Sequence, residues 1–314
     1  MSLLNELPKP DKKKKGWPWK EESEAGSWHT TKGLPKISII TPSFNQGDFI
    51  EETIRSVLLQ NYPNLEYIII DGGSTDNSLE IIKKYEPWLT YWTSERDNGQ
   101  SDAINKGFNL ATGEYGNWIN SDDLLEKNAL HTFSENAVSG TVKVLYVGKC
   151  LHTDINRNKS WMNEGRVDTF DQLIDIKNHW RKKNRIAQQS VMFNIQSYKE
   201  VGGLNVENHY SMDYELWGDL LLNGDKIRHI DVTMGIFRHY EGQKISDRYA
   251  TTKSLIKASK RLLKKNNSWN TTQKISAYFS ILNYQLKYLY GHIRSFIGIK
   301  RRTKSLITKI KSEV

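Results

Sequence analysis

Two adjacent carboxylates, Asp122 and Asp123, follow directly on a short apolar run in "GNWINSDDLLEKNAL" (116–130). Carboxylate oxygens are the ligands that Mg²⁺ and Mn²⁺ prefer, and Mg²⁺ usually binds one or two of them together with substrate phosphates. The same acids would also suit the start of a helix over "LLEKNAL", where carboxylates stabilise the first turn. The pair alone leaves both interpretations open.

Three further polar clusters also follow short β-rich runs. They are "TPSFNQGD" (41–48), "DGGSTDNS" (71–78) and "SERDNGQSD" (94–102). The four runs before the polar clusters predict strands, which lie at 36–40, 65–71, 89–94 and 115–120. Because ligands of parallel sheets bind beyond the carboxyl ends of the strands, all four clusters are expected at one edge.

The segments between these strands have helical periodicity, and Asp48 with Glu51 resembles a capping box at the start of the first. Strands that alternate with helices predict an α/β protein with a mixed, mainly parallel sheet flanked by helices. The next part of the chain is less regular. It predicts strands at 143–149 and 188–194, a helix at 212–224 ended by Gly224, and a final pair of strands within 226–240.

The bulk properties indicate a large domain with an appendage. A chain of 314 residues can bury a substantial core, and its single cysteine, Cys150, excludes an intrachain disulfide. The lysines of the first 20 residues come after a very short apolar stretch, which is the wrong order for a signal peptide, and no apolar run approaches 18 residues. We therefore expect a cytoplasmic protein.

The positive charge is concentrated at the end of the chain. Residues 251–314 hold 15 of the 45 Lys and Arg residues but one of the 36 acids. The same region has an apolar stripe at helical spacing, formed by Ile275, Phe279, Leu282, Leu286, Leu289, Ile293 and Phe296. Such a stripe would serve packing on the domain, contact with an anionic membrane or dimerisation.

The segment from "ISIITPSFNQGD" through "DGGSTD" to "NSDD" resembles glycosyltransferase family 2 in the order and spacing of its motifs. The resemblance covers about 36–245 and implies a GT-A fold, which is Rossmann-like. It implies a nucleotide-binding half at 36–125 and an acceptor half at 140–245. Residues 1–35 are expected to be an irregular lead-in, and 250–314 a basic amphipathic helical tail.

The resemblance implies a donor site for a nucleotide-sugar. "TPSFN" would line the base pocket, Asp71 would accept a hydrogen bond from the base, and Gly72 and Gly73 would let the backbone approach the ligand. For Asp71 the alternative is a cap of the helix that follows. The implied donor-binding residues are Thr41, Pro42, Ser43, Phe44, Asn45, Asp71, Gly73, Ser74, Gln100, Ser101, Asp102, Asn105, Asn120, Ser121, Asp122 and Asp123.

"NSDD" resembles the family's DxD metal motif, with Asn120 in place of its first acid. This places Asp122 at the ligand position for Mn²⁺ or Mg²⁺. The motif leaves the role of Asp123 open. "FRHYEG" resembles a segment whose histidine completes the metal or diphosphate site, which implies His239, although Tyr240 holds the usual place of that histidine.

The acceptor side is implied by "SMDYELWGDL" (211–220) and "AQQSVMFN" (187–194). By resemblance Asp213 is the general base at the start of a helix, with a surface acid or helix cap as the alternative. The implied acceptor contacts are Gln188, Gln189, Ser190, Glu215 as the second candidate base, and Trp217.

These expectations combine into one hypothesis. We expect the protein to transfer a sugar, with inversion, from a UDP-linked nucleotide-sugar to a hydroxyl of a glycan or lipid-linked acceptor, in cell-surface polysaccharide or glycolipid assembly. It would lie at the inner face of the cell membrane and could form a homodimer. The alternatives are a nucleotidyltransferase, for which "TPSFNQGD" lacks glycines and a basic residue, and a nucleic-acid-binding protein, for which no reader motif accompanies the basic tail. No nucleic acid is expected as a partner.

Overall fold

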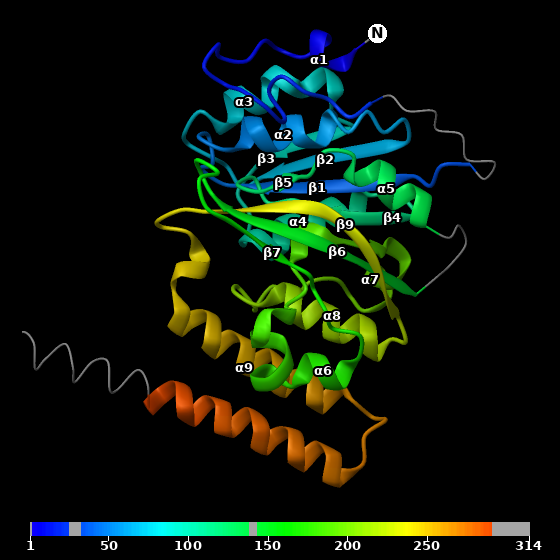
Figure 1. Cartoon of the computed structure of the whole chain (residues 1–314), viewed down its shortest axis with the longest axis vertical. Helices are drawn as coiled ribbons and strands as arrows, with labels where there is room; N and C mark the ends of the chain where they lie inside the picture. Colours follow the sequence, from blue (N-terminus) through cyan, green and yellow to red (C-terminus); the bar gives the residue numbers. More distant parts are fainter. Residues whose placement is uncertain (1, 25–32, 138–142, 291–314) are drawn as a thin grey trace, which may run out of the picture.

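The protein is described by a computed structural model over residues 2–24, 33–137 and 143–290. Within these ranges the chain forms one nine-stranded mixed sheet with helices on both faces (Figure 1). The strands are β1 (Ile37–Ser43), β2 (Leu65–Asp71), β3 (Tyr91–Ser94), β4 (Tyr115–Trp118), β5 (Leu124–Leu125), β6 (Val144–Asp154), β7 (Ser160–Asn163), β8 (Val191–Asn194) and β9 (Lys226–His239). Their order is β3-β2-β1-β4-β8-β6-β9-β5, with β7 paired to β6.

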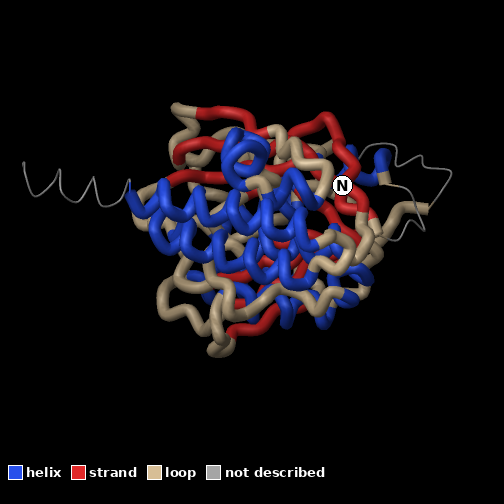
Figure 2. The backbone as a smooth tube through the Cα atoms, turned by 90° about the horizontal axis from the view of Figure 1, so that it is seen from below, coloured by secondary structure: helices blue, strands red, loops and turns tan. Residues whose placement is uncertain are grey.

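The helices cover the sheet in two layers, with α2, α3 and α5 on one face and α4, α6, α8 and α9 on the other (Figures 1 and 2). The α-helices are α1 (Leu3–Glu6), α2 (Ile50–Leu58), α3 (Ser78–Tyr85), α4 (Gln100–Leu110), α5 (Ala129–Asn136), α6 (Phe170–Ile174), α7 (Ile195–Glu200), α8 (Met212–Leu222) and α9 (Arg248–Lys265). Residues 271–290 form a further helix beyond α9. A π-helix spans Ile176–Asn184, and a short 3-10 turn spans Gln188–Ser190.

The first half of the sheet is parallel and the second half is mixed. β1 pairs in parallel with both β2 and β4, and β2 with β3. The four β-rich runs expected in this half therefore form strands, and their carboxyl ends lie at one edge. In the second half β8 is antiparallel to both β4 and β6, whereas β6 and β9 are parallel.

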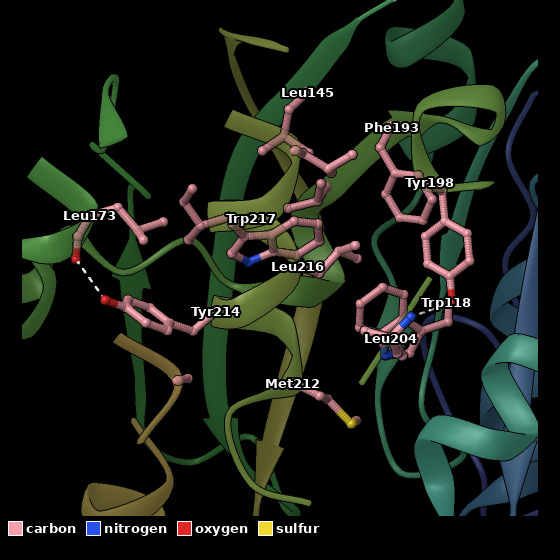
Figure 3. Packing of buried hydrophobic residues seen from close by; sticks show 14 of the residues in the cluster. Trp118, Leu145, Leu173, Phe193, Tyr198, Leu204, Met212, Tyr214, Leu216 and Trp217 are labelled. Carbon is pink, nitrogen blue, oxygen red and sulfur yellow. Dashed lines mark hydrogen bonds between the residues drawn. The ribbon is translucent and has the colours of Figure 1, made fainter. Parts of the chain in front are cut away.

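Apolar side chains fill both faces of the sheet. On the α8 face, Trp118 of β4 stacks on Trp217 of α8 with ring centroids 5.9 Å apart, and both side chains are fully buried (Figure 3). Phe193 of β8 lies beside Trp217 at 6.2 Å. This packing fixes α8 relative to the end of β4, and the sequence predicts the candidate base at the start of α8 and the candidate metal ligand after β4.

Three local expectations are wrong. α2 begins at Ile50 with Phe49 before it and no side-chain cap, because the Gln46 carbonyl already accepts the backbone N–H of both residues. The segment 226–240 holds one strand of 14 residues, since β6 pairs with β9 along its length through register shifts near Lys149. The acids at 122 and 123 do not begin a helix, because β5 follows them and α5 starts at Ala129.

The N-terminal lead-in packs on the sheet domain. Trp17 and Trp19 are buried, and the Trp17 indole N–H donates to the Leu125 carbonyl at 3.0 Å. Arg55 of α2 donates through Nε to the Pro18 carbonyl at 3.1 Å. In the tail, Ile275, Phe279, Leu282, Leu286 and Leu289 of the predicted stripe lie on helix 271–290, whereas Ile293 and Phe296 lie outside the described residues.

Candidate active site

Two polar loops, each at the carboxyl end of a neighbouring strand, are joined by hydrogen bonds. Ser43 of β1 lies opposite Asp71 of β2, which lies opposite Ser94 of β3. Asn45 donates its backbone N–H to Ser74 Oγ at 2.8 Å and accepts from the Thr75 N–H at the same distance. The expected convergence of these clusters at one edge is thus realised.

Asp71 organises the second of these loops. Its carboxylate, which is fully buried, accepts hydrogen bonds from the N–H groups of Gly73 and Ser74 at 3.1 and 2.8 Å. The hydroxyls of Ser74 and Ser94 also donate to this carboxylate, at 2.5 and 2.7 Å. In this structure the side chain holds its own loop, and the base contact that we expected of Asp71 stays a prediction.

The end of β1 offers one aromatic and one hydroxyl group to a ligand. Phe44 is 59% exposed, which is unusual for a side chain of this size. The buried Ser43 hydroxyl has no hydrogen-bond partner among the described residues, which is the kind of atom that a bound ligand satisfies. Thr41 is buried against the Tyr67 hydroxyl at 3.0 Å, and Pro42 is buried within β1.

Glycines let the loop after β2 approach its neighbour. A Cβ at Gly72 would lie 2.8 Å from the Asp97 carboxylate, so any other residue here would require that side chain to move. Gly73 has a φ of +82°, a region that favours glycine. Close contact at Gly72 and backbone conformation at Gly73 therefore explain why glycines suit these two positions.

Asp122 and Asp123 have different surroundings. Asp123 is buried, and its Oδ2 accepts from Gln189 Nε2 at 2.6 Å while its Oδ1 accepts from the Arg238 N–H at 3.2 Å. Burial and the nearby Asp122 charge raise the pKa of Asp123. Asp122 is only half-buried and accepts through Oδ2 from the Tyr240 hydroxyl at 2.9 Å. Asp122 is therefore the carboxylate that a ligand can reach.

Asn120 connects this pair to more distant elements. Its Nδ2 donates to Asp123 Oδ2 at 3.1 Å, and its Oδ1 accepts from Gln100 Nε2 at 2.7 Å. Gln100 Oε1 in turn accepts from Lys244 Nζ at 3.2 Å. The amide that replaces the first acid of the motif thus links the acid pair to Gln100 at the start of α4 and to Lys244 beyond β9.

Arg238 is a site residue to which the sequence assigned no role. Its buried guanidinium pairs with Glu52 at 2.7 Å and donates through Nε to the Asp122 carbonyl at 2.5 Å. Thr53 Oγ1 bonds the Ser121 and Asp123 carbonyls at 2.8 Å each. These contacts fix the backbone of the acid pair. Arg238 belongs to "FRHYEG", the motif in which the resemblance implied a role for the histidine alone.

His239 lies apart from these contacts. Its Nε2 is 3.0 Å from His152 Nδ1, and its ring stacks on Trp161 at 4.8 Å. Tyr240, the residue directly after β9, contacts Asp122 instead. Among the described residues no three His, Cys, Asp or Glu side chains lie together as a metal site. Asp122 and His239 as metal ligands stay a prediction.

Asp213 lies in the first turn of α8, as the sequence predicts. Its Oδ1 accepts from the Tyr214 N–H at 2.8 Å. Burial raises the pKa of Asp213, while the cationic Arg185 and Lys244 nearby act in the opposite direction. A carboxylate with a raised pKa is a better proton acceptor, which suits a general base.

The two other expected residues of α8 have structural roles. Glu215 is buried and pairs with Arg261 of α9 at 2.5 Å, with Asn208 donating to it at 2.6 Å. Trp217 is fully buried in the core against Trp118. In this structure both side chains are engaged inside the fold, and their assignment to the acceptor side stays a prediction.

Several other expected contacts also lie inside the fold. Gln188 is buried and donates to Asn117 Oδ1 at 2.9 Å, and Ser190 donates to the Ala187 carbonyl at 2.8 Å. Gln189 contacts Asp123 and so belongs to the acid pair. Their expected contacts with an acceptor stay predictions.

The donor-side residues of α4 are similarly engaged. Asn105 accepts from the Leu204 N–H at 2.9 Å and donates to the Leu204 carbonyl at the same distance, so it holds the turn after Gly203. Ser101 is buried with its hydroxyl 2.9 Å from Met212 Sδ. Asp102 accepts from the Asn98 N–H at 2.9 Å. Their contacts with the donor remain predictions.

The fold is shared with solved sugar transferases. Staphylococcus aureus TarS, in a structure with UDP-GlcNAc, matches with a TM-score of 0.61 at 18% identity, over 81% of this chain and 73% of that one. The mannosyltransferase PcManGT of Pyrobaculum calidifontis, in a structure with GDP-Man and Mn²⁺, matches with a TM-score of 0.56 at 15% identity, over 80% and 74%. The expected GT-A fold is therefore confirmed.

The sequence comparisons define the family. Residues 38–199, about half of the chain, match Glycosyl transferase family 2. The chain belongs to glycosyl transferase family 2. TuaG of Bacillus subtilis (strain 168), a glycosyltransferase whose name provisionally assigns it to teichuronic acid biosynthesis, is 39% identical over 38% of this chain and 49% of the relative. The chain thus spans about half the length of this relative.

A longer match joins this chain to a protein of Campylobacter jejuni (serotype O:2, strain ATCC 700819 / NCTC 11168). That protein is named GalNAc(5)-diNAcBac-PP-undecaprenol beta-1,3-glucosyltransferase. It is 26% identical over 89% of this chain and 94% of the relative. The likeness therefore extends beyond the 38–199 segment into the second half of the sheet and the helices that follow it.

Proposed function

We propose that the protein is an inverting glycosyltransferase that moves a sugar from a UDP-linked donor to a hydroxyl of a glycan or lipid-linked acceptor. One observation carries the proposal. A chain of hydrogen bonds runs from Asp123 through Asn120 and Gln100 to Lys244. Lys244 also interacts electrostatically with Asp213. The candidate donor end and the candidate base therefore belong to one connected site, which a two-substrate transfer requires.

The donor would bind where the first two strands end. The exposed Phe44 ring and the unpartnered Ser43 hydroxyl lie next to the loop that Asp71 holds. A flat aromatic ring suits stacking of a nucleobase, which is worth about 1–3 kcal/mol in single-stranded nucleic acid complexes. Uracil is the base that we propose, and its ring N–H would donate to the Asp71 carboxylate. Thymine and guanine carry a similar ring N–H, so the binding screen compares all three nucleotides.

The residues around Asp122 fit a divalent cation whose remaining ligands come from the substrate. Asp122 is half-buried, and one of its oxygens, Oδ2, accepts the Tyr240 and Gln243 hydrogen bonds. A single protein carboxylate is enough when phosphate oxygens supply the other ligands. Bound Mn²⁺ or Mg²⁺ would stabilise the negative charge that develops on the departing nucleoside diphosphate.

Asp213 would act on the acceptor. The acceptor hydroxyl oxygen attacks the anomeric carbon, the bond from that carbon to the diphosphate oxygen breaks, and the hydroxyl proton goes to the Asp213 carboxylate. Attack opposite to the leaving group inverts the anomeric centre. The cationic Arg185 and Lys244 beside Asp213 would favour an acceptor that carries phosphate or another anionic group.

The relatives suggest the biological setting. One is named for teichuronic acid biosynthesis and another for an undecaprenol-diphosphate-linked glycan. We therefore propose a role in cell-surface polysaccharide or glycolipid assembly at the inner face of the cell membrane. In the part of the chain that the structure describes, no helix is long and apolar enough to cross a membrane.

A binding screen tests the donor assignment. Thermal unfolding would be followed with UDP-, GDP- and dTDP-sugars, each with and without Mn²⁺. A ligand that binds the folded state stabilises it by mass action. We therefore expect UDP-sugars to raise the unfolding midpoint more than the other sugars do, and to raise it further when Mn²⁺ is present. Phe44→Ala should weaken this shift, whereas Tyr91→Ala, which also removes an exposed aromatic ring, should leave it unchanged. If only GDP-sugars raised the unfolding midpoint, the UDP assignment would be wrong and GDP would be the donor nucleotide.

A further inference from the structure

Helix 271–290 presents a continuous apolar ridge to solvent. Six of its side chains are exposed, by between 37% (Leu289) and 68% (Tyr290). At roughly 100° per residue they fall within an arc of about 100° on one side of the helix. The six are Ile275, Phe279, Leu282, Leu286, Leu289 and Tyr290. We call them the apolar ridge.

The opposite side of this helix attaches it to the protein. Ile281 is buried, and Ala277, Tyr278 and Tyr284 pack against the core cluster on the α8 face of the sheet. Packing on the domain therefore uses a different set of residues from the apolar ridge. Large apolar side chains gathered on one exposed face usually mark a binding surface.

A row of lysines lies on the neighbouring helix. Lys253, Lys257, Lys260 and Lys264 of α9 are spaced 4-3-4 and so share one side of that helix. Lys260 Nζ donates to Gln285 Oε1 of helix 271–290 at 3.3 Å, and the two helices lie side by side at one end of the molecule (Figures 1 and 2). Residues 251–290 contain eight Lys and Arg residues and no acid. The charged side chains of these two helices are therefore all positive, and of the eight, Arg261 and Lys265 pair with Glu215 and Asp219 of α8.

We infer that the apolar ridge and the lysine row form a docking surface for an anionic lipid bilayer. Apolar side chains would enter the acyl boundary while the lysines meet the headgroups, as in helices that lie in a membrane interface. A second copy of the chain fits less well, because a two-fold contact brings the same patch of both subunits together and would place the lysine rows close to each other. The docking surface itself does not depend on the proposed function. Only its consequence for the acceptor does.

The docking helices contact the residues around the candidate base. Ser211, just before α8, donates through Oγ to the Thr251 carbonyl of α9 at 3.4 Å. Arg181 lies over the Tyr284 ring of helix 271–290 at 5.6 Å. Asp213 is two residues from Ser211. Docking through the ridge would hold this end of the site near the bilayer, where the hydroxyl of a lipid-linked acceptor lies.

Vesicle co-sedimentation of the full chain tests the surface. The probes are vesicles of phosphatidylcholine alone and of phosphatidylcholine with phosphatidylglycerol. We expect binding to the anionic vesicles, at least about tenfold weaker binding by Phe279→Glu/Leu286→Glu, and loss of binding at high salt for the wild type. Leu110→Glu/Tyr91→Glu, which adds the same two charges at exposed apolar residues outside the ridge, should bind like the wild type.

Three results would overturn the inference. They are equal binding to neutral and anionic vesicles, unchanged binding by Phe279→Glu/Leu286→Glu, and a stable dimer in sedimentation velocity that these substitutions dissociate. Circular dichroism shows whether the variant is folded, and the single variant Phe279→Ser is used if it is not. Donor binding is measured on the same samples, so that a failed docking surface and a failed donor assignment are told apart.

Discussion

The Tyr240 hydroxyl donates a 2.9 Å hydrogen bond to Asp122 Oδ2, whereas the neighbouring His239 lies 3.0 Å from His152 on the other side of β9. Tyr240 also stacks on Phe49 of the turn before α2, with ring centroids 4.6 Å apart. Asp122 is thus held by a side chain that is itself fixed by packing. The orientation of the reachable carboxylate depends on this contact.

Removing the Tyr240 hydroxyl should weaken the binding of Mn²⁺ with UDP. A hydrogen bond of this kind contributes about 1 kcal/mol, so Tyr240→Phe is expected to raise the Mn²⁺ concentration at half-maximal UDP binding by roughly fivefold. Calorimetric titration of UDP at several Mn²⁺ concentrations measures this. His239→Ala is the comparison. A larger effect of His239→Ala than of Tyr240→Phe would assign the position near the metal to the histidine.

Asp213→Asn should abolish transfer while leaving donor binding intact. An amide cannot take the acceptor proton, and general-base catalysis contributes about 10²–10⁴-fold to a rate. We expect kcat to fall by about that factor with an unchanged UDP affinity. Full transfer by the variant would remove Asp213 as the base.

The same residue predicts the acidic limb of the pH profile. Burial raises the pKa of Asp213 above its ordinary value of 3.8, and a base works only when it is deprotonated. Transfer by the wild type should therefore be lost as the pH falls through this raised pKa, at a pH above the ordinary range of an aspartate. An acidic limb at or below pH 3.8 would contradict the assignment.

Glu215→Gln should destabilise the fold and spare the chemistry. Glu215 is buried and pairs with Arg261 at 2.5 Å, and removing one partner of a buried ion pair costs about 3–5 kcal/mol. Urea unfolding measures this loss, and kcat of the folded enzyme should stay within about twofold, well short of the loss expected for a general base. Glu164→Gln breaks the exposed pair with Arg166 and is the matched control, with an unchanged unfolding midpoint. A loss of kcat without a loss of stability would restore Glu215 as a candidate base.

Glu66 should make the fold sensitive to acid. Burial alone would raise its pKa, but hydrogen bonds from Ser38, Lys36 and Thr112 overcome this and lower the pKa from 4.5 to about 2. A lowered pKa means that the contribution to stability is present above pH 4.5 and is lost as the pH falls toward 2. Its size is roughly 3 kcal/mol, because the pKa falls by about 2.5 at 1.36 kcal/mol per pH unit.

Urea unfolding of the wild type and Glu66→Gln at pH 7 and pH 3 measures the contribution of Glu66. The difference in free energy of unfolding between the two proteins should shrink at the lower pH. A constant difference between pH 7 and pH 3 would show that the charge of Glu66 contributes nothing to stability.

The first half of the fold could be predicted from the sequence because its signals are local. The run Leu65–Asp71 was predicted as a strand at its observed bounds, since continuous β-branched residues between turn residues define a buried strand. The second half could not be predicted so well. β9 runs through a segment that suggested two strands, because its continuity depends on pairing with β6, more than 70 residues away in the chain.

The same division applies to the site. The motifs around Asp71, Asp122 and Asp213 resemble glycosyltransferase family 2 in their order and spacing, and this resemblance indicated a nucleotide-sugar transferase. The roles of Glu215 and Trp217 could not be predicted, since burial against α9 and β4 depends on how distant elements pack.

The sequence by itself determined the parallel strand edge, the family and the identity of the acidic residues. Only the tertiary structure decided that Asp123 is buried and Asp122 reachable, that Arg238 fixes their backbone, and that the apolar ridge faces solvent. The physical reason is the same in each case. Periodicity defines the face of an element on which a residue lies, whereas the partner of that face is set by contacts between residues far apart in the chain.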